Sequence, residues 1–403
     1  MRILLVNDHG TRVGGAEVIV FSLRDALRAR GHEVRVFSSS AREHGDPIEA
    51  DATGFGTTSR WRTLVQSVNP RAARSFRDEL ARFRPDVVHV HLYQTQLSPL
   101  ILGELGGGLD GVPAVYYAQW YREICFLGTR RRPEGWTCES RVGVACLRAK
   151  CVKTHDWPAL MVQLGIDRAL GRRFSSVTAI SQAVANRLAK HGPPHLRDAR
   201  VVHPGTEVVE PRRELPSDPV VLVAGRVVEE KGIETLIRAF AKIARRHPTS
   251  RLVVVGDGPQ RPWLERLAAD EFRLADRIEF RGRRTHAETL AAMRQASVVC
   301  VPSTWEEPFG MVAAEAQMHG VAVIASRTGG LAEIVEEGVT GHLVPPADFE
   351  ALAARLDERF ADRDGTMAMG LRGHERARAL FSLDDFAERF EAVYRDAITA
   401  AAR

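Results

Sequence analysis

Two glutamates, Glu307 and Glu315, are the residues whose type and spacing first indicate chemistry in this sequence. They stand eight positions apart around a Pro-Phe-Gly tripeptide, between apolar runs at 297–302 and 320–326. Those runs predict strand, loop, helix and strand, with Glu307 in the loop and Glu315 in the helix. Glu315 could then reach the same cleft as Glu307, whereas the simpler interpretation is a loop Glu and a solvated helix Glu.

The Pro-Phe-Gly tripeptide is expected to open the helix that carries Glu315. Pro308 suits the first helical turn, because its missing N–H would have no partner there. The amides of Phe309, Gly310 and Met311 would then point out of the helix N-terminus. A terminus of this kind favours a phosphate or a sugar hydroxyl.

A second cluster of functional residue types follows the predicted strand at 220–224. Arg226 and Lys231 come after Gly225 in the pattern G-R-x-x-x-x-K-G. They are expected at the carboxyl end of that strand, where open parallel sheets bind ligands. The alternative is that both are ordinary solvated cations.

Three motifs together resemble glycosyltransferase family 4, a family of retaining, nucleotide-sugar-dependent enzymes with the GT-B fold. They are the pair Glu307 and Glu315, the G-R-x-x-x-x-K-G pattern, and an N-terminal Gly-Gly-Ala-Glu followed by L-x-x-R-G-H-E-V at 27–34. The resemblance covers most of the chain, and the motifs occur in the expected order. It implies a nucleotide diphosphate sugar donor and a hydroxyl-bearing acceptor.

The resemblance also implies a role for each motif residue. Gly14 and Gly15 would let a loop close over the donor diphosphate, and Arg226 and Lys231 would neutralise it as it leaves. Glu307 would hold the donor sugar hydroxyls. The remaining donor-binding residues would be Gly225, Arg281 (near the base), Phe309, Gly310, Met311 and Glu315 (on the ribose).

His91 and Gln119 are weaker candidates for the acceptor side. His91 ends the run Pro-Asp-Val-Val-His-Val-His, and a strand histidine is more often structural. Gln119 stands where related sequences commonly have a histidine. Glutamine forms hydrogen bonds but carries no proton, so the substitution puts the usual donor contact in doubt.

Four of the five cysteines, Cys125, Cys138, Cys146 and Cys151, fall in one short stretch. Their spacing matches no standard zinc pattern, although a structural zinc would suit four thiols. Unpaired packed thiols and disulfides are the alternatives, and a reducing cytosol disfavours the disulfides. No catalytic metal or cofactor is expected, because no D-x-D follows a strand.

Charge is concentrated in the same stretch. Residues 120–155 contain eight basic and three acidic residues, an excess equal to the formal net charge of +5 for the whole chain. This indicates a local anionic contact and not a general nucleic-acid-binding protein. The start of the sequence does not read as a signal peptide and no apolar run would span a bilayer, so a cytoplasmic protein is expected, with peripheral contact at the inner face of a membrane left open.

The order of predicted elements indicates an α/β protein of two doubly wound Rossmann-like domains, which in the GT-B fold face each other across a cleft. The 403 residues suit two domains. We expect an acceptor-side domain at 1–205 with the basic insertion 120–155, a proline-rich linker at 206–219 and a nucleotide-sugar-binding domain at 220–382. Family likeness implies that a last helix, 383–403, crosses back to the first domain, and that 337–348 forms a hairpin.

The sequence therefore predicts a metal-independent hexosyltransferase that retains configuration. A glycoside hydrolase using Glu307 and Glu315 as acid and nucleophile is the nearest enzymatic alternative, but it leaves Arg226 and Lys231 without a role. A non-catalytic GT-B carbohydrate-binding scaffold is the alternative of a different class.

Overall fold

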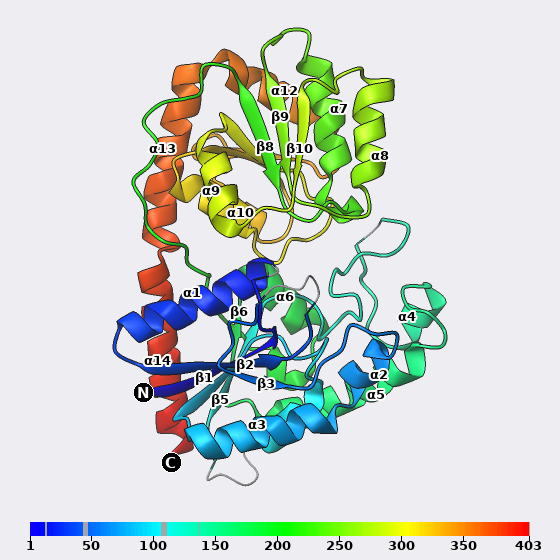
Figure 1. Ribbon diagram of the computed structural model, residues 1–403, viewed down its shortest axis with the longest axis vertical. Coiled ribbons are helices and arrows are strands. Elements are labelled where there is room, and N and C mark those ends of the chain that lie inside the picture. The colour runs from blue at the N-terminus through cyan, green and yellow to red at the C-terminus, as the bar shows by residue number, and fades with distance from the viewer. Residues whose placement is uncertain (13, 43–46, 106–110, 136, 403) are drawn as a thin grey trace. The chain divides into compact units, whose positions relative to one another are not determined.

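Apolar strands alternate with amphipathic helices along the chain, and in the computed structural model they build two parallel sheets (Figure 1). The structure describes residues 1–12, 14–42, 47–105, 111–135 and 137–402. Unit 1 consists of Met1–Gly205 and Leu383–Arg403, and unit 2 of Thr206–Ser382. The predicted fold class, α/β with two doubly wound Rossmann-like sheets, is confirmed.

Unit 1 has a seven-stranded sheet of order β3-β2-β1-β4-β5-β6-β7, in which every paired strand is parallel. Its strands are β1 (Arg2–His9), β2 (Glu33–Ser39), β3 (Ala52–Gly54), β4 (Val87–Val90), β5 (Ala114–Ala118), β6 (Ser176–Ala179) and β7 (Arg200–Val201). Its helices are α1 (Gly15–Ala29), α2 (Arg62–Ser67), α3 (Pro70–Phe83), α4 (Val144–Arg148), α5 (Trp157–Leu170), α6 (Gln182–His191) and α14 (Leu383–Ala401), with short turns η1 (Pro99–Glu104), η2 (Gly171–Arg173) and η3 (Pro194–Leu196).

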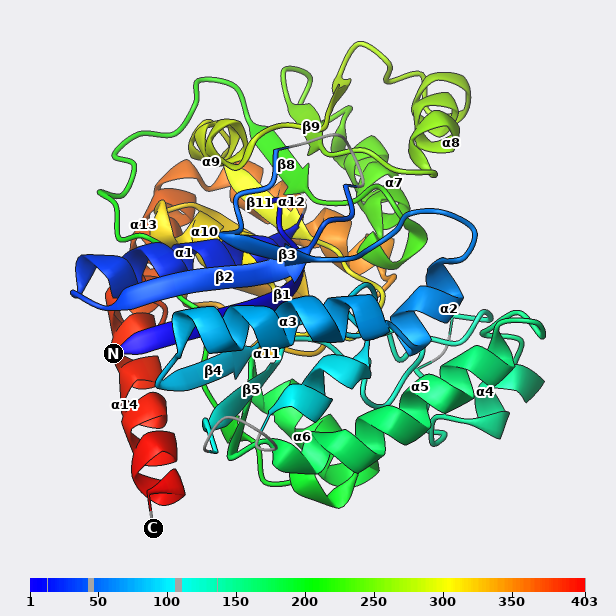
Figure 2. The same ribbon diagram turned by 60° about the horizontal axis from the view of Figure 1, so that its bottom comes forward.

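Helix α14 completes unit 1, although it comes from the far end of the sequence. It packs on α1 and on strands β4 and β5. Tyr394 bonds through its hydroxyl to Nδ1 of His89 at 2.7 Å, and Arg30 donates to Glu391 at 2.6 Å. On another part of the unit, α3 packs against β3 and η1. Figure 2 shows α3 from a second side.

Unit 2 has a six-stranded sheet of order β10-β9-β8-β11-β12-β13, again with parallel pairing. Its strands are β8 (Val220–Ala224), β9 (Arg251–Val255), β10 (Ile278–Gly282), β11 (Val298–Val301), β12 (Ala322–Ser326) and β13 (Gly341–Val344). Its helices are α7 (Ile233–Ile243), α8 (Arg261–Arg266), α9 (His286–Arg294), α10 (Met311–Met318), α11 (Leu331–Ile334), α12 (Phe349–Ala361) and α13 (Arg363–Leu380), with short η4 (Glu229–Lys231) and η5 (Leu267–Glu271).

The helices of unit 2 pack on one another as well as on the sheet. Helix α7 packs with α12, and α10 packs with both α9 and α13. Side chains on strands β8, β9 and β11 are buried beneath α7, since Val221, Leu252 and Val298 share one core with Leu236 and Phe240. Burial of both faces explains why these strands read as continuous apolar runs.

One predicted element is wrong. The segment 337–348 does not form a hairpin, because β13 runs parallel to β12 as the last strand of the sheet. A tight turn precedes it, in which Thr340 N–H donates to the carbonyl of Glu336. Among the described residues, no helix combines the length and apolar character needed to cross a bilayer.

Candidate active site

The predicted site residues of unit 2 follow neighbouring strands of its sheet. Strands β8, β11 and β12 lie side by side, and their carboxyl ends share one edge. The loop after β8 carries Lys231, the loop after β11 carries Glu307, and the loop after β12 carries Gly329 and Gly330. This is the edge at which doubly wound sheets bind their ligands.

Lys231 and Glu307 form the centre of this edge. The Lys231 Nζ atom lies 2.5 Å from Oε1 of Glu307, and Ser303 donates to the same oxygen at 2.6 Å. The side chain of Glu307 is 6% exposed, so burial favours the neutral acid, but Lys231 and the hydrogen bonds to the carboxylate lower its pKa below the ordinary value. The site thus holds a buried carboxylate in its charged form beside a partly exposed ammonium group.

The three loops are fitted to one another through glycines. Gly232 has a φ of +64°, and a Cβ at that position would overlap the carbonyl oxygen of Pro302. A Cβ on Gly329 would overlap the carbonyl oxygen of Glu307. Thr304 N–H also donates to the carbonyl of Glu230 at 2.8 Å, so the backbone fixes how Lys231 and Glu307 meet.

The start of α10 differs from the prediction. The helix begins at Met311 and not at Pro308, because Gly310 adopts a left-handed φ of +114° as its cap. Phe309 is buried and packs edge-on against Phe381 at 5.4 Å between ring centroids. The anchored aromatic ring holds the Pro-Phe segment outside the helix, so among the predicted amides only that of Met311 belongs to the first helical turn.

Glu315 lies on α10 and is buried against an unpredicted partner. Its Oε1 atom is 2.8 Å from Nε2 of His286, the first residue of α9. Nothing in the sequence pattern marks His286, because the pair joins residues on two different helices. Glu315 does not share its bonding partners with Glu307, although its role on a ribose remains a prediction.

The other donor-binding candidates of unit 2 lie along the same sheet edge. Gly225 follows β8 with a φ of +141°, and Arg226 is largely exposed and 3.4 Å from Glu230. Arg281 on β10 makes a two-pronged ion pair with Glu279. A groove at this end of the sheet is lined by Val255, Glu279, Arg281, Arg284, Glu288 and Ala292.

In unit 1, Gly14 and Gly15 form the start of α1. Gly14 is the cap residue in an extended conformation, and its N–H donates to the Glu17 carboxylate at 3.0 Å. Asn7 Nδ2 lies 3.4 Å from the same carboxylate, and burial raises the pKa of Glu17. Glu17 therefore holds the glycine turn, a role that the spacing of a capping box would have revealed.

His91 and Gln119, the weaker candidates, contact each other inside unit 1. Gln119 Nε2 lies 2.9 Å from His91 Nδ1, which makes Nδ1 the acceptor when the amide donates. Within the described parts of the chain, His91 Nε2 and Gln119 Oε1 are buried without a hydrogen-bond partner. Burial lowers the pKa of His91 to about 3, so the ring is neutral.

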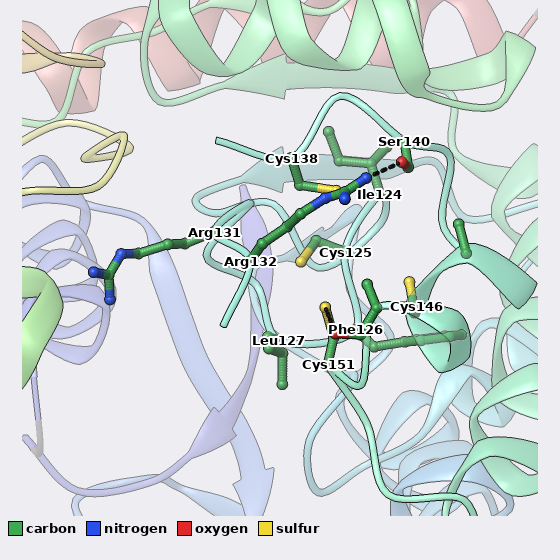
Figure 3. A pocket seen from close by; sticks show the side chains of 12 residues that line it. Ile124, Cys125, Phe126, Leu127, Arg131, Arg132, Cys138, Ser140, Cys146 and Cys151 are labelled. Carbon is green, nitrogen blue, oxygen red and sulfur yellow. Dashed lines mark hydrogen bonds between the residues drawn. The ribbon is translucent and has the colours of Figure 1, made fainter. Parts of the chain in front are cut away.

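The four clustered cysteines line one small cavity in unit 1, together with Arg131 and Arg132 (Figure 3). All four are free thiols. Burial, and then the neighbouring thiols, raise the pKa of Cys151 to about 11. Among the described residues, no three His, Cys, Asp or Glu side chains stand in metal-coordinating positions.

Two family models together match most of the chain. Residues 13–210 match the model described as Glycosyltransferase Family 4, and residues 207–376 match Glycosyl transferases group 1. The two matches meet close to the end of the first segment of unit 1, at Gly205.

Curated and solved proteins show the same similarity over nearly the full length. Glycogen synthase of Mycobacterium tuberculosis is 27% identical over 385 residues, which span 88% of this chain and 85% of that protein. Sucrose-phosphate synthase from Thermosynechococcus elongatus matches with a TM-score of 0.73 and 27% identity over 99% of this chain and all of that chain. The Anabaena protein HepE, solved with UDP and glucose, matches with a TM-score of 0.70 and 21% identity over 98% of this chain and 99% of its own.

Proposed function

This chain belongs to glycosyltransferase family 4, and we propose that it is a retaining hexosyltransferase that moves a sugar from a nucleotide diphosphate to an acceptor hydroxyl. The cluster of Lys231, Glu307 and Ser303 carries this proposal. It provides a fixed cation for a diphosphate and a charged carboxylate for sugar hydroxyls, at the edge of the sheet where ligands bind.

The cations act on the leaving group. As the bond between the sugar C1 and the phosphate oxygen breaks, negative charge grows on the diphosphate. Lys231 has N–H donors besides the one that bonds to Glu307. The Arg226 guanidinium, on the same loop, is exposed. Both stabilise the departing charge more than they stabilise the intact donor.

Glu307 holds the sugar and does not act as nucleophile. Lys231 and Ser303 both bind its Oε1 atom, and Oε2 has acceptor capacity for a sugar hydroxyl. The leaving phosphate oxygen takes the proton of the acceptor hydroxyl on the face that it leaves, where the new C1–O bond forms. This route retains configuration and requires neither a protein base nor a metal ion.

Two further observations support the donor class. The HepE structures contain UDP, glucose or UDP-glucose, and their fold matches this chain. Arg281 also lies at the β10 end of the sheet edge, beside a groove, where family likeness puts the base. We assign His91 and Gln119 to the acceptor side of unit 1, where His91 Nε2–H would be a donor and Gln119 Oε1 an acceptor for hydroxyl groups.

A donor screen tests this function. The full chain is incubated with a panel of UDP-, GDP- and ADP-sugars, without added Mg²⁺ or Mn²⁺, and slow release of the nucleoside diphosphate is measured. One donor should be hydrolysed, and NMR of the first product should show the anomeric configuration of the donor. Inverted product, or turnover that appears only with added metal, contradicts the mechanism, and sugar release from glycosides without nucleotide contradicts the function.

We also propose that unit 1 binds the surface of an anionic membrane on the cytoplasmic side. Trp61, Leu64 and Val68 are exposed on and beside α2, and Phe55 is exposed nearby. The sequence 52–77 around them has five arginines and no acidic residue, which suits an anionic surface with apolar insertion.

Vesicle co-sedimentation tests the membrane contact. Phosphatidylglycerol vesicles should retain the protein and phosphatidylcholine vesicles should not. Trp61→Ser combined with Leu64→Ser should reduce retention by roughly tenfold, because it removes most of the exposed apolar area. If the variant is retained as well as the wild type, or if both kinds of vesicle bind the protein equally, the proposed membrane contact is wrong.

A further inference from the structure

The long segment between β5 and α5, residues 119–156, has little regular structure to hold it. Its described part contains one short helix, α4, besides turns. Its buried apolar residues in the described part are Tyr121, Ile124, Phe126 and Val142, and of these Phe126 and Val142 pack with Leu160 and Leu164 of α5. Loops of this length without their own secondary structure need another source of order, and small cores of this kind commonly rely on disulfides or a metal ion.

The backbone of this segment brings its four cysteines to one place. Cys125 starts a turn that closes when Gly128 N–H donates to its carbonyl at 2.9 Å. Cys138 ends a second turn, with its N–H on the carbonyl of Arg130 at 2.6 Å. Cys146 lies in α4, and Cys151 N–H donates to the Cys146 carbonyl at 3.0 Å. Two turns, helix α4 and the chain just after it thus present four thiols to one cavity, as Figure 3 shows.

Arg130, in the segment that lines this cavity, is a buried arginine. Arg130 is 1% exposed, and only its Nη1 donates, to the carbonyl of Ser140. In the part of the chain that the structure describes, its Nε and Nη2 have no hydrogen-bond partner and no carboxylate pairs with it. Arg131 and Arg132 line the cavity itself. A buried cation without an anion is costly, so the surroundings of Arg130 indicate a negative charge that forms beside it.

We propose that Cys125, Cys138, Cys146 and Cys151 bind one Zn²⁺ ion as thiolates, and that Arg130 and its two neighbours balance the resulting charge. Each thiol releases its proton to solvent, so the ion with four thiolates carries a net charge of −2. Neutral packed thiols or two disulfides would leave Arg130 without a counter-charge. The four described sulfur atoms are not arranged as the ligands of one ion, so Zn²⁺ binding moves them toward the centre of the cavity that they line.

Metal analysis of the full chain tests this inference. Protein purified from zinc-supplemented cells and desalted should contain about one equivalent of zinc by mass spectrometry, which the Cys125→Ser, Cys146→Ser double variant should lose. Cys300→Ser is the matched control, because Cys300 is buried in β11 of unit 2. It should keep the zinc.

Substitution of Arg130 tests whether this arginine supports the bound metal. Arg130→Ala should weaken zinc binding by roughly tenfold or more in a competition titration with a chromophoric chelator, the usual effect of removing a group that supports metal ligands. Arg141→Ala, an exposed arginine of the same segment, should leave the affinity unchanged. Equal affinities for the two variants would remove the role of Arg130.

Cobalt exchange keeps the inference testable if the cysteine variants fail to fold. Wild-type protein loaded with Co²⁺ should show thiolate charge-transfer absorption and the visible bands of a tetrahedral ion. Native protein with five titratable thiols and no stoichiometric metal would overturn the inference. Disulfides found by peptide mapping, or an iron–sulfur cluster with acid-labile sulfide, would overturn it as well.

Discussion

At the scale of single residues, the Lys231–Glu307 contact links the proposed catalytic role to the stability of the site. Glu307 is buried and charged, and Lys231 is its cation. The residue that would stabilise a leaving diphosphate therefore also compensates a buried carboxylate. A substitution at either position acts on both properties.

Lys231→Ala should lower the turnover number by roughly two to three powers of ten, the effect of losing one charge-stabilising donor. It should also lower the free energy of unfolding by about 1–3 kcal/mol, because Glu307 loses its buried partner. Steady-state kinetics and thermal melts measure the two effects. Lys242→Ala, which breaks a surface ion pair with Glu350, is the control. Near-normal turnover of Lys231→Ala would exclude its catalytic role.

Glu123 makes the stability of unit 1 depend on pH. Burial raises the pKa of Glu123 to about 8, and the Tyr116 hydroxyl donates to its carboxyl group. Between its ordinary pKa and about 8, the carboxyl is neutral in the folded protein and charged in the unfolded chain. The folded state then binds the extra proton, so stability falls as pH rises through this window.

Within this window, the free energy of unfolding should fall less steeply with pH in Glu123→Gln than in the wild type. The difference in slope should be about 1.4 kcal/mol per pH unit, as expected for one proton. Urea denaturation at a series of pH values measures it. Glu134→Gln, at an exposed position in the same segment, should leave the slope unchanged. If both variants keep the wild-type slope, Glu123 is not the group responsible.

At the scale of elements, the sequence predicted which strands and loops build the site, but not how the loops fit together. Apolar runs located β8, β11 and β12, and parallel order then put Lys231 and Glu307 at one edge. The start of α10 could not be predicted, because it depends on the tertiary contact of Phe309 with Phe381. The partners Ser303 and His286 were missed since they are defined by contacts and not by spacing, whereas Glu17 had a capping signal.

The loop after β12 contacts the backbone of Glu307, and Gly329→Ala tests whether this contact positions the Glu307 side chain. Gly329 has a φ of +53°, and an added Cβ would overlap the carbonyl oxygen of Glu307. Gly338→Ala is a matched control, because its φ is +74° and no described atom lies within 4 Å of an added Cβ. Both changes should cost about 1–2 kcal/mol of backbone strain.

Only Gly329→Ala should also reduce kcat/KM, by roughly tenfold to a hundredfold, because it shifts the carboxylate that we propose holds the sugar. Kinetics with the donor identified in the screen, alongside thermal melts, separate strain from displacement. Equal kinetic losses in the two variants would mean that displacement of Glu307 is not the cause.

At the scale of the whole molecule, the alternation of elements was sufficient to predict two doubly wound sheets. The strand orders and the packing of α14 within unit 1 were not readable from pattern alone, because they depend on contacts between residues far apart in sequence. Phe390 of α14, for example, is buried against His89 of β4 and Tyr117 of β5.

Phe390→Ala should destabilise unit 1 by about 3–5 kcal/mol, the usual cost of emptying a large buried site. Hydrogen exchange followed by mass spectrometry should speed up in β4 and β5 but not in β8 to β12. Glu388→Ala, exposed on the same helix, should change stability by less than about 0.5 kcal/mol. Faster exchange across both units in Phe390→Ala would show that α14 does not act on unit 1 alone.

The return of α14 to unit 1 has a consequence for biosynthesis. A ribosome makes residues 206–382 after strands β1 to β7 of unit 1 and before its last helix. At the usual speed of translation, unit 1 waits on the order of ten seconds or more for α14, while unit 2 can already fold. The nascent N-terminal sheet therefore exposes the surface around His89 and Tyr117 during that interval, and exposed apolar surface of this kind favours aggregation or chaperone binding.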